Sequence, residues 1–88
     1  MISSEVTISN RLGLHARPAA KLVHLAAAGK SEVFIVKDGQ RVNARSILGV
    51  MLLAAEFGSA VRLEVNGEDE SEMLSRLVEL VHNKFGED

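Results

Sequence analysis

His15 and Arg17 lie two residues apart, and their side chains could together bind and accept a negatively charged group. Pro18 follows Arg17, and proline is favoured in the first turn of a helix, where its fixed φ is compatible and its missing N–H is not needed. The first turn of a helix has backbone N–H groups without partners, and it carries the positive pole of the helix dipole. An anion there would meet free donors and the guanidinium of Arg17. These residues therefore predict an anion site at His15, with phosphate as the obvious ligand.

Phosphoryl chemistry at His15 requires a neutral imidazole, because a ring nitrogen must attack phosphorus through its lone pair. Arg17 and the helix N-terminus both disfavour the charged imidazolium, since like charges repel. They also stabilise the phosphate after it is attached, and the helix dipole contributes about 0.3–1 kcal/mol. An interaction of this size holds the phosphate on the histidine without making its attachment irreversible. The residues alone do not distinguish Nδ1 from Nε2 as the attacking atom.

The helix that positions His15 is expected to cover residues 16–28. Apolar residues recur there at the i, i+3, i+4, i+7 spacing of one helical face: Ala19, Leu22, Val23 and Ala26. Gly29 is a typical C-terminal stop. His15 is therefore expected at the first turn or just before it.

Four segments have the pattern of strands: residues 2–8, 31–37, 40–43 and 61–65. The second segment is apolar on both faces, which predicts a strand inside the sheet. The third is polar, which predicts an edge strand. Asp38 and Gly39 between these two segments are a strong hairpin signal.

Two further helices are expected. The first, residues 47–54, follows Ser46, a preferred N-cap because its hydroxyl accepts a hydrogen bond from an unpaired N–H. The second is a long helix whose apolar positions extend to Phe85, and Asp69 and Glu72 resemble a capping box at its start. This order of elements predicts an antiparallel sheet with helices packed on one face. The same order also suits the ferredoxin-like arrangement, and periodicity leaves the strand order open.

The short helix at residues 47–54 is apolar almost all round. A short helix in a small domain buries only one face, so part of this surface should be exposed, and exposed apolar patches usually mark contact sites. Ile47, Leu48 and Met51 are therefore the candidate partner-docking residues, on an apolar face expected near His15.

Two separated motifs, residues 13–19 (GLHARPA) and residues 42–51 (VNARSILGVM), resemble the histidine-containing phosphocarrier (HPr) family of the bacterial phosphoenolpyruvate-dependent sugar phosphotransferase system. The resemblance covers essentially the whole chain. It implies an α+β fold of one domain over residues 1–88. This fold is an open-faced β-sandwich with a four-stranded antiparallel sheet, strand order 1-4-2-3, and three helices on one face.

The resemblance also implies a function. A carrier of this family accepts a phosphoryl group on Nδ1 of its histidine, here His15, from enzyme I, for which phosphoenolpyruvate is the ultimate donor. It passes the group to the EIIA domains of sugar permeases. Arg17 would stabilise the phosphate, and Ser46 would be phosphorylated by HPr kinase/phosphorylase. Such a carrier is cytoplasmic, is not an enzyme, and needs no cofactor of its own.

Composition limits the other classes of function. The 88 residues carry a net charge of −2 and include three Phe but no Trp, Tyr or Cys. The negative net charge and the few aromatic residues argue against nucleic-acid binding. The absence of cysteine excludes disulfides and cysteine-ligated metals. The longest apolar run, residues 50–55, is too short for membrane insertion, and no signal peptide is visible. His24 and His82 are expected to be solvated helix residues, and no metal-ligand motif is present.

Three alternatives stay open. The nearest is the nitrogen-branch phosphocarrier paralogue of the same family, since residues 10–13 and 84–88 slightly resemble that branch, whereas Ser46 in its apolar setting favours the sugar carrier. A small nucleic-acid-binding α/β module is the alternative from another class. A small acid–base enzyme is the third, and it would need a second catalytic group near His15, where only Arg17 is available.

Overall fold

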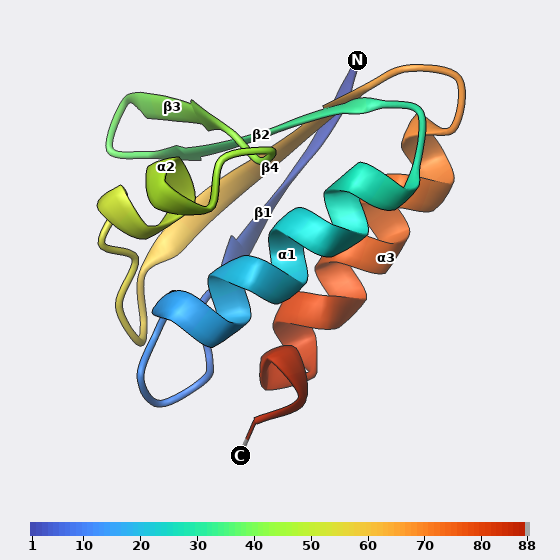
Figure 1. Cartoon of the computed structure of the whole chain (residues 1–88). Helices are drawn as coiled ribbons and strands as arrows, with labels where there is room; N and C mark the ends of the chain where they lie inside the picture. The colour runs from blue at the N-terminus through green and yellow to red at the C-terminus, as the bar shows by residue number, and fades with distance from the viewer. Residues whose placement is uncertain (88) are drawn as a thin grey trace.

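Four strands and three helices follow one another along the chain, and a computed structural model describes residues 1–87 (Figure 1). The elements are β1 (Ile2–Thr7), α1 (Ala16–Ala28), β2 (Glu32–Lys37), β3 (Gln40–Asn43), α2 (Ile47–Leu52), β4 (Ala60–Asn66), α3 (Glu70–His82) and a short 3₁₀ turn, η1 (Lys84–Gly86). Each predicted helix and strand is present, and α1 and β3 have the predicted bounds. Residue 88, which belongs to the segment 84–88 considered above, lies outside the described residues.

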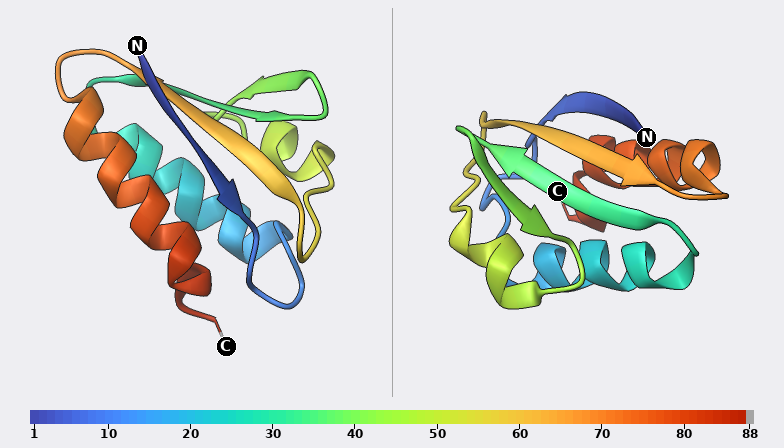
Figure 2. Two further views of the ribbon diagram at one scale, coloured as in Figure 1. Left: turned by 180° about the vertical axis from the view of Figure 1, so that it is seen from behind. Right: turned by 90° about the horizontal axis from the view of Figure 1, so that it is seen from above.

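The four strands form one antiparallel sheet in the order β1-β4-β2-β3. This order confirms the one that the family resemblance implies, and the ferredoxin-like alternative is wrong. β2 lies inside the sheet and β3 at an edge, as their sequences predict. Val33 is opposite Val65, and Ile35 is opposite Leu63, where β2 pairs with β4. All three helices cover one face of the sheet and leave the other face open (Figures 1 and 2).

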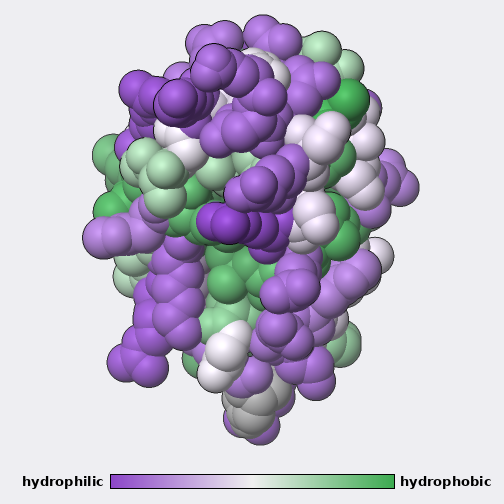
Figure 3. Space-filling view, turned by 90° about the vertical axis from the view of Figure 1, so that its right-hand side faces the viewer, coloured by the Kyte–Doolittle hydropathy of each residue, from purple (hydrophilic) through white to green (hydrophobic). Residues whose placement is uncertain are grey.

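The core lies between the sheet and the helices. On β4, Val61, Leu63 and Val65 are buried, and they alternate with Arg62 and Glu64 on the open face. The helices contribute buried apolar side chains: Ala19 and Leu22 from α1, Val50 from α2, and Leu77 and Val81 from α3. On the side of the molecule where α3 lies, apolar surface shows in several areas between hydrophilic side chains (Figure 3). Burial of one face of α1 fixes the helix start, and with it His15, relative to the sheet.

The open face of the sheet holds a charged cluster. Nε of Arg41 and Nε of Arg62 donate hydrogen bonds to the two carboxylate oxygens of Glu64, at 2.8 and 3.1 Å. Glu64 is only 8% exposed, and the hydrogen bond from Arg41 in particular lowers the pKa of its carboxyl below the ordinary value. The Arg41 guanidinium also lies 3.7 Å from the centre of the Phe34 ring. The cluster keeps a nearly buried carboxylate ionised and paired.

The predicted capping box at Asp69 and Glu72 is wrong. The Asp69 side chain makes no capping hydrogen bond in its own helix. Its carboxylate instead accepts hydrogen bonds from the backbone N–H of Lys30, at 3.0 Å, and from the Ser31 hydroxyl. The connection between α1 and β2 lies beside the start of α3, and it offers these two donors to the carboxylate in place of the helix N–H groups.

Two helix ends also differ from the prediction. α2 ends at Leu52 and not near residue 54, because Ala54 has a left-handed conformation with φ of 52°. Phe85 does not belong to α3, since Lys84 and Phe85 both have φ of 56° and turn the chain after the helix. Phe85 is nevertheless fully buried, so its predicted place in the core is confirmed.

Candidate functional site

His15 is the N-cap residue of α1, which confirms its expected place at the helix start. Its backbone is extended, with φ of −82° and ψ of −169°, and its imidazole makes no capping hydrogen bond. Its carbonyl accepts a hydrogen bond from the N–H of Ala19 at 3.0 Å. Within the described residues, the backbone N–H groups of Ala16 and Arg17 have no hydrogen-bond partner. His15 therefore lies beside two free donors and the positive end of α1.

The loop before His15 is held against the segment that follows α2. The N–H of Leu14 donates to the carbonyl of Ala55 at 2.9 Å, and the Leu14 side chain is buried. Gly13 has φ of +70°, and a Cβ at this position would lie 2.5 Å from the Ala55 carbonyl oxygen. Only glycine allows both the left-handed conformation and this close approach. The glycine of the first motif thus fixes the loop that carries His15.

Asn10 connects this loop to the segment that follows α3. It is fully buried, and its amide nitrogen donates to the Gly13 carbonyl at 2.7 Å and to Oε1 of Glu87 at 3.1 Å. Its own Oδ1 is buried without a hydrogen-bond partner among the described residues. One side chain therefore orients both the loop before His15 and a carboxylate beside it.

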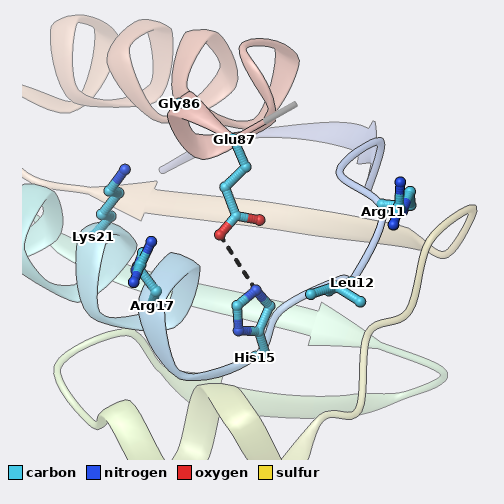
Figure 4. Close-up of a pocket in the computed structure, with 7 residues that line it drawn as sticks. All are labelled: Arg11, Leu12, His15, Arg17, Lys21, Gly86 and Glu87. Atoms are coloured by element: carbon cyan, nitrogen blue, oxygen red, sulfur yellow. Dashed lines mark ion pairs between the residues drawn. The ribbon is translucent and has the colours of Figure 1, made fainter.

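Glu87 places that carboxylate next to the imidazole. Its Oε2 lies 3.3 Å from Nε2 of His15, and Figure 4 shows the two side chains pointing toward each other. Nε2 is buried, and at this geometry it has no hydrogen bond within the part of the chain described. Glu87 therefore brings a negative charge to the imidazole, whereas Arg11, Arg17 and Lys21 bring positive charges to the same hollow. Sequence reasoning missed Glu87, because no local pattern around residue 87 points to His15.

Cationic side chains surround the same hollow. Arg11, Arg17 and Lys21 line it together with His15, and its volume is about 490 Å³ (Figure 4). Arg17 is exposed, so its guanidinium is available to a ligand. Lys21 has a further role, since its Nζ donates to the Phe85 carbonyl at 2.6 Å. The hollow can therefore hold a multiply charged anion against the imidazole.

Ser46 is the N-cap of α2, as expected. Its Oγ accepts a hydrogen bond from the backbone N–H of Gly49 at 2.9 Å. Ser46 is exposed, so its hydroxyl can be reached from solvent.

The exposed apolar surface around α2 is larger than predicted. Ile47, Leu48 and Met51 are 41%, 66% and 37% exposed. Leu52 of the same helix is also exposed, although it was not among the predicted docking residues, and sequence reasoning missed the exposed Leu12 and Phe57. Leu12 and His15 line a second hollow with residues 54–56, which follow α2, so apolar surface reaches the imidazole. The term apolar patch is used below for Leu12, Ile47, Leu48, Met51 and Leu52.

The other two histidines, His24 and His82, are exposed helix residues, which confirms the prediction for them. In residues 1–87 there is no group of three or more His, Cys, Asp or Glu side chains that could hold a metal ion. In the same part of the chain, every helix is too short or too polar to cross a membrane.

Known proteins resemble this chain over nearly its whole length. The sequence model of the family described as "PTS HPr component phosphorylation site" matches residues 2–83. The chain is 49% identical over 87 residues to the phosphocarrier protein HPr of Cupriavidus necator, covering 99% of this chain and 98% of that protein. It is 47% identical over 88 residues to the HPr of Treponema pallidum, covering 100% of both. A crystal structure of HPr from Thermoanaerobacter tengcongensis is similar with a TM-score of 0.96 at 43% identity, covering 100% of this chain and 99% of the other.

Proposed function

This chain belongs to the HPr phosphocarrier family of the phosphotransferase system, and on this premise we propose that it carries a phosphoryl group on His15 between two protein partners. The family consists of phosphocarrier proteins and not of catalytic enzymes. The observation that carries the proposal is the place of His15 at the start of α1, beside two free N–H groups and the guanidinium of Arg17. These groups stabilise a phosphoryl group on the imidazole.

The donor in this proposal is enzyme I, charged from phosphoenolpyruvate, and the acceptors are the EIIA domains of sugar permeases. The apolar patch supports it, because Leu12 lines a hollow with His15, α2 packs against α1, and exposed apolar side chains suit a docking surface. Arg11, Arg17 and Lys21 add positive charge around His15, which suits partners with acidic surfaces. The carrier works in the cytoplasm, without a cofactor of its own.

Ser46 is the regulatory site in this proposal, and HPr kinase/phosphorylase is the enzyme that modifies it. Its exposed hydroxyl at the start of α2 supports this role. A phosphate on Ser46 adds about −1.5 to −2 charge beside Ile47 and Leu48, where partners dock. The added charge repels an acidic donor surface and so slows the loading of His15. Ser46 in its apolar setting also favours the sugar branch of the family over the nitrogen branch.

The test is to incubate the protein with phosphoenolpyruvate and enzyme I, to measure the mass of the product, and to treat the product with acid. The wild-type chain gains one acid-labile phosphoryl group, and His15→Ala gains none while keeping the wild-type circular dichroism spectrum. His24→Ala and His82→Ala are matched controls, since both residues are exposed helix histidines, and both variants are phosphorylated like the wild type. Acid-labile phosphate on His15→Ala would overturn the proposal.

A further inference from the structure

We propose that Glu87 is a positioning residue for His15: its carboxylate binds the proton on Nε2 and so leaves the lone pair on Nδ1. This inference rests on the proposed function of His15, and it identifies the group that decides which ring nitrogen reacts. Its basis is the contact of 3.3 Å between Oε2 of Glu87 and the buried Nε2.

The argument begins with the imidazole. A neutral imidazole has one N–H donor and one nitrogen with a lone pair, and the partner of one nitrogen fixes the state of the other. A carboxylate only accepts hydrogen bonds, so it selects the form with the proton on Nε2. Among the described residues that line this hollow, Glu87 is the only carboxylate, and the other charged side chains are cations. Figure 4 shows the other ring nitrogen, Nδ1, on the side of the ring away from Glu87.

The carboxylate is held by contacts that do not involve His15. The amide of Asn10 donates to Oε1 at 3.1 Å, which leaves Oε2 for the imidazole. The backbone N–H of Glu87 donates to the carbonyl of Lys84 at 2.9 Å. Lys84 and Phe85 both adopt left-handed backbone conformations, which residues other than glycine disfavour. Strain of this kind persists only where surrounding contacts enforce it, and it concentrates at functional sites.

During phosphoryl transfer, the proton stays on Nε2, and all bonds and charges are accounted for without its loss. The lone pair of Nδ1 attacks phosphorus, a bond forms between Nδ1 and phosphorus, and the bond between phosphorus and the donor breaks with its electron pair staying on the donor. The product ring carries the phosphoryl group on Nδ1 and the original proton on Nε2, so it has one positive charge. The carboxylate of Glu87 is then the counter-ion of that ring. When the group moves on, a nucleophile of the acceptor attacks phosphorus, and the bond between Nδ1 and phosphorus breaks with its electron pair returning to Nδ1.

The contact has room to strengthen during the reaction. A separation of 3.3 Å is longer than the usual N–H···O distance of about 2.9 Å. Hydrogen bonds at reactive groups are often long in the free protein and tighten when the reactant is bound. Positive charge on the ring also makes the hydrogen bond charge-assisted on both sides, and such bonds are shorter.

The first test measures the imidazole directly and needs no phosphorylation. Nitrogen-15 NMR of the histidine side chains at alkaline pH distinguishes the Nε2–H form from the Nδ1–H form. We expect His15 of the wild type to carry its proton on Nε2, and Glu87→Gln to show a measurable population of the Nδ1–H form. Glu79→Gln is the matched control, because Glu79 is an exposed residue of α3, and this variant keeps the wild-type spectrum of His15.

The second test compares phosphoryl transfer from enzyme I under single-turnover conditions. Glu87→Gln should transfer about tenfold more slowly than the wild type and Glu79→Gln, the scale found when carboxylate partners of metal-binding histidines are removed. Unchanged NMR signals of His15 together with an unchanged rate in Glu87→Gln would overturn the inference, as would a wild-type His15 protonated on Nδ1. A wild type that takes up no phosphoryl group, yet shows the expected NMR difference, would contradict the proposed function and leave the role of Glu87 intact.

Discussion

The carboxylate of Asp69 at the start of α3 accepts hydrogen bonds from the hydroxyl of Ser31 and the backbone N–H of Lys30. These bonds link the connection between β4 and α3 to the connection between α1 and β2. The hydrogen bond from Ser31 is the main cause that lowers the pKa of Asp69, and the backbone N–H of Lys30 adds to it. Gly29 lies in the same contact, since a Cβ there would be 2.7 Å from Oδ2 of Asp69. The folded protein therefore prefers this carboxyl ionised.

Replacement of Asp69 should change how stability depends on pH. Because the pKa of Asp69 is lower in the folded state, the unfolded chain binds the proton more readily. The stabilisation is complete above the unfolded value of about 3.9, and it is lost as pH falls through the lower folded value. Asp69→Asn should therefore melt at a lower temperature than the wild type near neutral pH, and the difference should shrink in acid. The melting temperatures of both proteins are measured by circular dichroism from neutral to acidic pH. A difference in melting temperature that does not change with pH would contradict the account.

Gly13→Ala should disturb the loop that carries His15. The new Cβ would meet the Ala55 carbonyl oxygen at 2.5 Å, and φ of +70° disfavours alanine. We expect a loss of about 1–3 kcal/mol in the free energy of unfolding, together with slower phosphorylation of His15. Gly39→Ala is the control, because its φ is +79° but no atom lies within 4 Å of its Cβ. Urea titrations and transfer rates that are equal for the two variants would show that the contact with Ala55 does not position the site.

Met51→Asp should weaken docking of the donor and of the acceptor. Met51 is 37% exposed in the apolar patch, and a charge there must lose its water when a partner binds. The expected loss is about 1–2 kcal/mol of binding free energy, which is roughly a tenfold lower transfer rate at low partner concentration. Ser75→Asp, at an exposed position of α3, should transfer normally. If Met51→Asp and Ser75→Asp transferred at equal rates with enzyme I and with EIIA, α2 would not be part of the docking surface.

Substitutions at Ser46 should separate stability from regulation. Ser46→Ala removes the acceptor for the Gly49 N–H and should cost about 1 kcal/mol of stability, but it should load His15 at the wild-type rate. Ser46→Asp keeps a capping acceptor and places a negative charge at the positive end of α2, so its melting temperature should stay near that of the wild type. Its transfer from enzyme I should be slower. A large drop in the melting temperature of Ser46→Asp would show that unfolding, and not repulsion, slows transfer.

Local patterns were sufficient for most of the fold. Pro18 and Gly29 bracket α1, and Asp38 with Gly39 marks the hairpin between β2 and β3, because each of these signals acts within a few residues. The strand order needed the family resemblance, since the order of elements suits more than one topology.

The contacts that sequence reasoning missed join residues far apart in the chain. Asn10 and Glu87 are 77 positions apart, and Ser31 and Asp69 are 38 positions apart. No periodicity relates such pairs, and a glutamate or asparagine near a chain turn looks like any solvated residue. The apolar patch was found only in part for a similar reason, because the exposure of Leu12 depends on how its loop folds against the segment after α2.

The pairing of β1 with β4 also determines when the molecule can assemble during synthesis. Ile2 pairs with Val65 and Thr7 with Ala60, so β1 is made well before the neighbour with which it pairs, with α1, β2, β3 and α2 made in between. At about 5–20 residues per second, this interval lasts on the order of seconds. His15 precedes β2, β3, β4 and α3 in the chain, whereas Glu87, which contacts it, follows all of them. The contact between His15 and Glu87 therefore forms only after all four strands and α3 have been made.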